Sequence, residues 1–263
     1  MIKHFRLFFQ GALLSYKALF RWLRPSAYIA SKIIAPLNQI LFFTFLGMYA
    51  SGQKDASFFI IGNAVQMAAV SGIYGVTMSI GGDRWEGTLP YLFGTPANRF
   101  VMFFGRGFFH ILDGFLGVWI GLFLGVILLG LDLSAANFPM LLLIILITTF
   151  STSGLGLLLG CLSLITRNVM FVNNTVYFLL LIFAGANIPL ESMPPWMHSI
   201  SRSLPLTRGI STARAAIAGS PASSILPVLL EELLIGLGYM LFGFMLFRWF
   251  EQAAKRRGTL EAM

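Results

Sequence analysis

Residues 139–164, "PMLLLIILITTFSTSGLGLLLGCLSL", contain no charged side chain. An α-helix needs about 20 residues to cross a roughly 30 Å hydrocarbon core, and this stretch exceeds that length. It does not alternate between apolar and polar residues, as the strands of a membrane β-barrel do. The stretch therefore predicts a transmembrane helix, and it indicates that the chain is an all-α membrane protein.

The composition of the 263 residues supports this class. Hydrophobic residues make up 57% of the chain and charged residues 11%, whereas soluble domains average roughly 25% charged residues. The mean hydropathy is +0.82. The single cysteine, Cys161, lies in an apolar run, so we expect a buried apolar side chain and neither a disulfide framework nor a cysteine metal site.

Six stretches have the length and apolar character of transmembrane helices. They lie near residues 28–50, 58–80, 107–131, 139–164, 169–189 and 227–249. The first is the least regular, because it contains Lys32, Pro36, Asn38 and Gln39. No internal repeat is visible, which favours a single transmembrane domain over residues 1–263.

The lysines and arginines predict the orientation of these spans. Fourteen of the 18 lie in the two terminal segments, in the adjoining ends of the first and sixth stretches (Lys32 and Arg248), and in the connections after the second and fourth stretches. The other four are Lys54, Arg202, Arg208 and Arg214. Cytoplasmic connections carry the excess of positive charge, so both termini are predicted to be cytoplasmic. The net charge of +8 reflects this bias and does not indicate nucleic-acid binding.

The first 25 residues differ from a signal peptide, which has an uninterrupted apolar core. Basic residues recur at helical spacing and share one face, while phenylalanine and leucine occupy most of the other: the basic ones are Lys3, Arg6, Lys17, Arg21 and Arg24. This pattern predicts an amphipathic helix over 1–25 in the cytoplasmic interface. Pro25 ends that helix and turns the chain into the first span.

Residues 82–100, "GDRWEGTLPYLFGTPANRF", separate the second and third stretches on the cytoplasmic side. Thr88 and Thr95 are suitable helix N-caps, each followed within two residues by a proline. The segment is therefore predicted to form a short helix and turn across the membrane face. It is either a surface loop that holds two spans in place or a docking surface for a cytoplasmic partner.

A second irregular segment, 190–225, is predicted on the outer side. Prolines and glycines divide it into half-apolar pieces that are too short to span, and Trp196 suits an interfacial depth. We expect re-entrant or surface-lying helices here, between the fifth and sixth spans.

Both irregular segments resemble those of type-2 ABC exporter permeases. The inner motif consists of Glu86-Gly87-Thr88-Leu89, Leu92 and Thr95-Pro96. The outer motif consists of Pro189-Leu190, Pro194, Trp196, Leu204-Pro205-Leu206-Thr207, Arg214 and Gly219. Their order and sidedness, with the amphipathic start and six spans, extend the resemblance over nearly the whole chain.

The resemblance implies a membrane-spanning subunit of an ATP-driven exporter in the plasma membrane of a bacterium or archaeon. Two permeases pair, either two copies of this chain or one copy with a homologous permease, and two ATP-binding cassette subunits dock beneath them. The inner segment couples ATP-driven closure to the spans. Its expected coupling residues are Arg84, Glu86, Gly87, Thr88, Leu89, Thr95 and Pro96.

The resemblance further implies outward transport of an amphiphilic substrate, such as a drug, lipid, peptide or glycoconjugate, by alternating access. The phosphate-binding motif G-x-x-x-x-G-K-[ST] does not occur in the sequence. ATP and Mg²⁺ are therefore expected on the partner subunit, with no cofactor in this chain. The three histidines, His4, His110 and His198, fall in separate regions, so no catalytic or metal site is predicted.

Polar and small residues recur inside the spans. Six polar residues line a substrate path or form buried hydrogen bonds: Asn38, Gln39, Asn63, Gln66, Asn173 and Asn174. Glycines repeat at every fourth position in the third and fourth spans, and such faces let helices approach closely. They are Gly117, Gly121 and Gly125, and Gly156 and Gly160. Packing within the chain is the expected use, and a dimer seam is the alternative.

Arg106, His110 and Asp113 share one stripe of the third span. They form a proton relay, or they lie near the cytoplasmic interface, where Arg106 reaches water and the other two pair locally. Glu231 and Glu232 are either interfacial or part of an outer gate. An ion- or proton-coupled secondary transporter is the alternative function, and it requires mid-span charges and related halves.

Overall fold

The computed structural model describes residues 8–14, 16–17, 25–52, 55–88, 91, 94–96, 98–163 and 168–257. The regular structure of these residues is helical throughout, which confirms the all-α class. The α-helices are α2 (Pro25–Ser51), α3 (Ser57–Ala69), α4 (Val76–Trp85), α6 (Arg99–Leu129), α7 (Phe138–Ser163), α8 (Val169–Phe183), α9 (Pro195–Ser203), α10 (Thr207–Ile217) and α11 (Ala222–Arg257). A π-helical turn, η1 (Val70–Gly75), joins α3 to α4, and a 3-10 turn, η2 (Leu190–Ser192), precedes α9.

Five helical stretches in the described part of the chain are long and apolar enough to cross a membrane. They are Ile29–Ser51, Ser57–Gly82, Arg99–Leu129, Phe138–Leu162 and Ala222–Ala253. The remaining expected span, 169–189, contains α8, which is apolar but has only 15 residues. These rise about 22 Å, and Gly185, with a φ of 78°, turns the chain after them. A sixth span therefore remains a prediction.

The first and second spans differ locally from the sequence-based expectation. α2 is continuous although Pro36 lies inside it, because neighbouring groups in a membrane protein can satisfy the backbone that a proline frees. The second span contains the π-turn η1, which no periodicity of the sequence indicated. π-turns are often found at functional sites.

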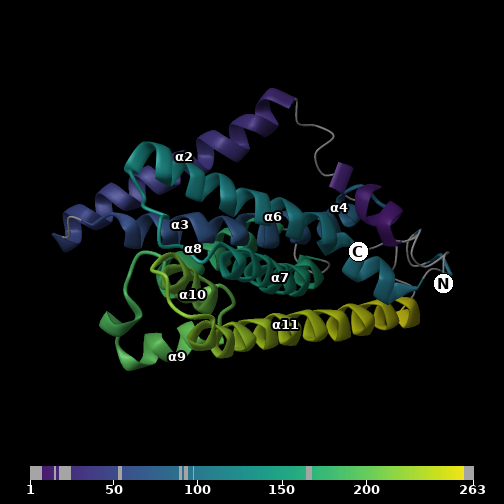
Figure 1. Cartoon of the computed structure of the whole chain (residues 1–263). Helices are drawn as coiled ribbons and strands as arrows, with labels where there is room; N and C mark the ends of the chain where they lie inside the picture. The colour runs from purple at the N-terminus through teal and green to yellow at the C-terminus, as the bar shows by residue number, and fades with distance from the viewer. Residues whose placement is uncertain are drawn as a thin grey trace.

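The helices α3, α6, α7 and α11 run along roughly one direction, and α2 crosses them obliquely (Figure 1). α3 and α7 occupy the interior, α2 and α6 lie along one side, and α11 lies along the other. α9 and α10 lie at one end of this bundle, whereas the last turns of α11 lie at the opposite end, near α4. We call these the outer and inner ends, after the predicted sidedness.

Glycines allow the interior helices to approach each other closely. A Cβ atom on Gly156 of α7 would collide with the carbonyl oxygen of Gly72 in η1. A Cβ atom on Gly121 of α6 would lie 3.1 Å from Ala64 of α3, and one on Gly125 would collide with Ile60. The repeated glycines therefore serve packing within the chain, as expected, because backbones can approach closely only where side chains are absent.

Only part of the predicted amphipathic helix, 1–25, falls within the described residues. Residues 8–14 and 16–17 are helical, and their aromatic rings contact α6. The ring centroids of Phe9 and Phe108 are 5.2 Å apart, and those of Tyr16 and Phe109 are 5.8 Å apart. Pro25 is the first residue of α2, a position that suits proline because its missing N–H is not needed there.

The outer segment contains short helices, as expected. α9 has 9 residues and α10 has 11, and neither is long enough to span. Whether they re-enter the membrane remains a prediction. Cys161 is buried, as expected, and its thiol contacts the carbonyl oxygen of Gly243 at 3.1 Å.

Candidate functional site

The inner segment leaves α4 through a tight turn. The N–H of Glu86 donates to the carbonyl of Gly82 over 2.9 Å, and Gly87 adopts a φ of 66°, which favours glycine. Glu86 and Gly87 are exposed, and Thr88 is half-buried. These three predicted coupling residues are thus accessible to a partner.

The middle of this segment is described only in part. Leu89 and the predicted helix start at residues 89–90 lie outside the described residues, and so does the side chain of Arg84. Tyr91 is 78% exposed, and Gly94, Thr95 and Pro96 are exposed as well. The described residues of the segment between Glu86 and Pro96 therefore form an accessible surface.

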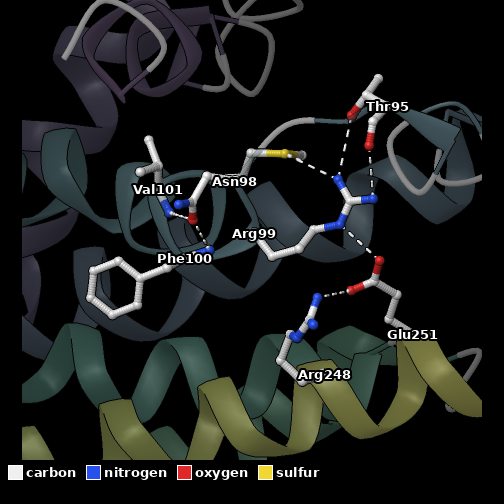
Figure 2. Close-up of polar contacts among 8 residues, drawn as sticks. Thr95, Asn98, Arg99, Phe100, Val101, Arg248 and Glu251 are labelled. Carbon is white, nitrogen blue, oxygen red and sulfur yellow. Dashed lines mark hydrogen bonds and ion pairs between the residues drawn. The ribbon is translucent and has the colours of Figure 1, made fainter. Parts of the chain in front are cut away.

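The segment ends at the first residues of α6, where two side chains fix the backbone (Figure 2). Asn98 caps the helix: its side-chain oxygen accepts from the N–H groups of Phe100 at 3.0 Å and Val101 at 3.3 Å. Arg99 reaches back to Thr95, donating from Nη2 to the carbonyl oxygen at 3.0 Å and from Nη1 to the hydroxyl at 3.4 Å. Thr95 is thereby held against the start of α6.

Arg99 also joins the inner segment to the last helix. Its Nε donates to Oε1 of Glu251 over 2.7 Å, and Arg248 donates to Oε2 of the same carboxylate over 2.9 Å. Glu251 is 2% exposed and Arg99 is 11% exposed. Both carboxylate oxygens are thus compensated by guanidinium groups, as a buried charge requires.

Phenylalanines of α6 and α11 also contact one another near this end of the two helices. The ring centroids of Phe103 and Phe247 are 5.1 Å apart, and those of Phe100 and Phe244 are 5.5 Å apart. Phe104 also contacts Phe244. Aromatic pairs at such distances contribute about 0.5–1.5 kcal/mol each beyond their buried area, so the start of α6 and the last third of α11 form one packed unit.

At the outer end, α11 holds the start of α10. Oε1 of Glu232 accepts from the N–H of Leu206 over 2.6 Å. Leu206 has a φ of 85°, a backbone conformation that costs energy in a residue with a branched side chain. Its side chain is fully buried. An ion pair between Arg208 and the exposed Glu231, at 2.7 Å, accompanies this contact, whereas Glu232 is buried. An interfacial place for Glu231 and a gate role for either glutamate remain predictions.

Arg214 of α10 ties the outer segment together. Its guanidinium donates to the carbonyl oxygens of Gly185, Ala186 and Phe58 at 2.9–3.0 Å, and it lies 3.5 Å from the ring centroid of Phe58. Burial lowers the pKa of Arg214 to about 9, so the group remains charged at neutral pH. It closes the end of α8 against α3 and α10.

The six predicted path residues fall into two groups. Gln39 accepts from the hydroxyl of Tyr177 at 2.6 Å, and exposed Asn174 accepts from the hydroxyl of Tyr74 at 2.7 Å. The two tyrosine rings are 5.7 Å apart, so these four residues form one polar and aromatic cluster between α2, η1 and α8. Asn38 is exposed on α2. Tyr74 and Tyr177 were not predicted, because the sequence does not show which helices their hydroxyl groups face.

The other three path residues are fully buried. Asn63 donates to Asn187 over 2.7 Å and to the carbonyl oxygen of Phe59 over 2.9 Å, so it is a structural hydrogen-bonding group. Gln66 and Asn173 have no hydrogen-bond partner among the described residues. Buried amides of this kind are costly, and they remain candidates for the path.

The stripe of Arg106, His110 and Asp113 connects helices. Asp113 is paired with Lys32 of α2 and accepts from Ser71 of η1 over 2.6 Å. Arg106 donates to the carbonyl oxygen of Ser79 in α4. The carboxylate of Asp113 therefore binds a charged partner on another helix, and the two alternatives for this stripe, a proton relay or a local pair near the cytoplasmic interface, remain predictions. Lys32 was counted only toward orientation, and its role inside the bundle was missed.

Two comparisons with known proteins bear on this geometry. A family model, described as ABC-2 type transporter, matches residues 10–218. This range contains α2 to α10, including the inner segment and the outer helices. A search of curated proteins found no match. Because the family model covers most of the chain and the described helices have the length of membrane spans, the chain belongs to the ABC-2 type transporters and is a membrane subunit of an ABC transporter.

Proposed function

We propose that this subunit is an exporter permease driven by a separate ATPase, and that its inner segment docks the ATPase. The observation that carries the proposal is the accessible turn at Glu86 and Gly87, whose following residues are fixed to α6 and α11 through Arg99. A surface turn that only separates two helices needs no such anchoring. Permeases of this family work with ATP-binding cassette subunits.

In this proposal, Glu86 is the main docking contact. Its carboxylate is exposed and accepts hydrogen bonds from basic or backbone donors of the partner, each contributing about 1.5–3 kcal/mol. Gly87 keeps the turn in the conformation that presents it. Arg84, Thr88, Leu89, Thr95 and Pro96 complete the docking surface.

The ATPase binds ATP and Mg²⁺, since this sequence lacks a phosphate-binding loop. Two ATPase copies act on two permeases, which are two copies of this chain or one copy with a homologous permease. The complex lies in the plasma membrane of a bacterium or archaeon, with both permease termini in the cytoplasm. The basic residues of the inner connections support this orientation.

The substrate is an amphiphile, such as a drug, lipid, peptide or glycoconjugate, that moves outward. The cluster of Gln39, Tyr74, Asn174 and Tyr177 supports this class, because it offers hydrogen-bonding groups and aromatic faces together between membrane helices. Asn38 lies on α2 with Gln39. A purely apolar substrate needs no such polar groups, and an ion needs no aromatic ones.

A second candidate is an ion- or proton-coupled transporter. It is favoured by the cluster of half-buried Lys32 with the buried residues Ser71, His110 and Asp113, because ionisable groups inside spans often mark ion pathways. We favour the first function because the family works with ATPases and because the charge of Asp113 is compensated by Lys32.

One experiment separates the two functions. The chain is purified alone and together with an ATP-binding cassette subunit, both in lipid vesicles. We expect no ATP hydrolysis by the chain alone, and hydrolysis by the complex that rises with a transported amphiphile. Transport that a proton gradient drives without ATP would instead support the second candidate.

A further inference from the structure

We propose that α11 is a rigid connection between the inner segment and the outer helix α10, with Arg99 and Glu232 as the positioning residues at its two ends. The inner joint is the ion pair of Arg99 with Glu251, and the outer joint is the hydrogen bond from Leu206 to Glu232. This inference rests on the proposed role of the inner segment, and it assigns the route by which that segment acts on the outer side.

The separation of the joints fits a connection across the membrane. Glu232 and Glu251 are 19 positions apart on one helix, which corresponds to about 28 Å along its axis and is close to the thickness of the hydrocarbon core. Pro227 is the proline inside α11, and it precedes Glu232. The helix between the joints is therefore uninterrupted.

α7 stiffens α11 along this length. A Cβ atom on Gly236 would approach Ser151 to 2.6 Å, and one on Gly243 would lie 3.0 Å from the backbone of Leu158. The two helices thus pack backbone to backbone at two levels. A displacement applied at Glu251 is carried along this pair rather than absorbed by bending, because packed helices deform little.

Each joint contains a polar contact that two helices do not need in order to pack against each other. Arg99 binds Glu251 through Nε and Thr95 through both terminal nitrogens, so one planar group holds the inner segment and α11 together. At the outer joint, Glu232 stabilises the N–H of Leu206 in a strained conformation. Backbone strain is retained where the surroundings impose it, often in segments that switch.

The choice of variants follows from this geometry. Arg99→Lys keeps the charge but has one nitrogen in place of three, so it cannot hold Glu251 and Thr95 together. Arg248→Gln is the matched control, because it removes a guanidinium from the same carboxylate without breaking a contact between helices. Glu232→Gln alters the outer joint while keeping the size of the side chain.

The test is a double-mutant cycle on the full chain in lipid nanodiscs, read by hydrogen exchange of the backbone amides in 98–104 and 206–212. Arg99→Lys is expected to raise exchange about tenfold at the inner joint, as for one lost charge-assisted hydrogen bond, and about threefold or more at the outer joint. The control Arg248→Gln is expected to change the exchange rates at both joints by less than threefold. The double variant Arg99→Lys/Glu232→Gln is expected to raise exchange by less than the product of the two single increases.

Independent effects at the two ends would overturn the connection, because distant sites without shared partners usually act additively. Glu251→Gln replaces Arg99→Lys if that variant does not accumulate in the membrane. No ATPase is present in this experiment. If the exchange experiment shows coupled ends but an ATPase does not respond to this chain, the connection through α11 would stand and the exporter function would be excluded.

Discussion

Glu251 and Glu232 are two buried carboxylates on the same helix, and they are held in different ways. Two guanidinium groups bind Glu251, one from α6 and one from α11 itself. Glu232 accepts the backbone N–H of Leu206, and its other neighbours are the neutral hydroxyl of Ser151 and, at a greater distance, the guanidinium of Arg208. The inner joint is thus a compensated ion pair, whereas the outer joint depends mainly on a hydrogen bond from a backbone N–H.

This difference suggests that the two ends of α11 have different mechanical properties. A buried carboxylate with two charged partners resists separation, because breaking the pair exposes an uncompensated charge. A hydrogen bond to a strained residue is weaker and is released at a lower cost. The inner end is therefore expected to move as one unit, and the outer end is the place where contacts change.

The largest effect concerns the sides of the membrane on which the joints lie. Gly94→Cys and Ser203→Cys each place a thiol at an exposed position beside one joint. We expect an impermeant maleimide to label Ser203→Cys from outside and Gly94→Cys only after the membrane is opened. Cys161 is buried and is replaced by alanine as a precaution. Labelling of both from the same side would exclude the proposed connection.

Removing the inter-helix partner of the inner joint comes next. Arg99→Ala leaves Glu251 buried with Arg248 alone, and we expect the free energy of unfolding in mixed micelles to fall by about 3 kcal/mol, the low end for a broken buried pair. The double variant Arg99→Ala/Glu251→Ala should lose less unfolding free energy than the sum of the losses in the two single variants. A loss below 1 kcal/mol in Arg99→Ala would mean that the inner joint is not a buried pair in the membrane.

The outer joint should respond less strongly. Glu232→Gln keeps the size of the side chain and an acceptor for the N–H of Leu206 but weakens that bond, and we expect a cost of at most about 1 kcal/mol, the net value of one ordinary hydrogen bond. The measurement is the same unfolding titration. A cost equal to that of Arg99→Ala would remove the difference between the two ends.

The smallest effect is expected for Arg248→Gln. Arg248 is 42% exposed and lies three residues from Glu251 on the same helix, so its guanidinium is partly hydrated, and helical pairs at this spacing contribute below about 0.5 kcal/mol. The change in unfolding free energy should therefore lie close to experimental error. A large loss would show that Arg248, rather than Arg99, compensates Glu251.

The sequence predicted the features that depend on local patterns. Five spans follow from the length of apolar runs, and the inner and outer segments follow from clustered prolines, glycines and capping residues. The close contacts of Gly121 and Gly156 follow from glycine spacing, although their partner helices do not. Each of these signals lies within a stretch of sequence no longer than about one helix.

The contacts that build the candidate site could not be predicted in this way. Arg99 and Glu251 are 152 positions apart, and hydropathy carries no information on which faces of two helices meet. Lys32 was interpreted as an orientation signal for the same reason, because its partner Asp113 lies on another helix. The π-turn η1 depends on packing against α7, since its residues have no distinctive composition.

In the proposed function the inner segment transmits the action of an ATPase to the spans, and a substitution at Glu86 measures this transmission. Glu86→Ala in the complex should leave the amount of assembled complex unchanged, because exposed substitutions usually cost under about 0.5 kcal/mol in stability. Transport per ATP hydrolysed should fall about tenfold, the equivalent of one charge-assisted hydrogen bond. Glu191→Ala is the matched control, an exposed glutamate in the outer segment, and it should transport normally. Normal coupling in both Glu86→Ala and Gly87→Pro would contradict the claim and leave the segment as a surface turn.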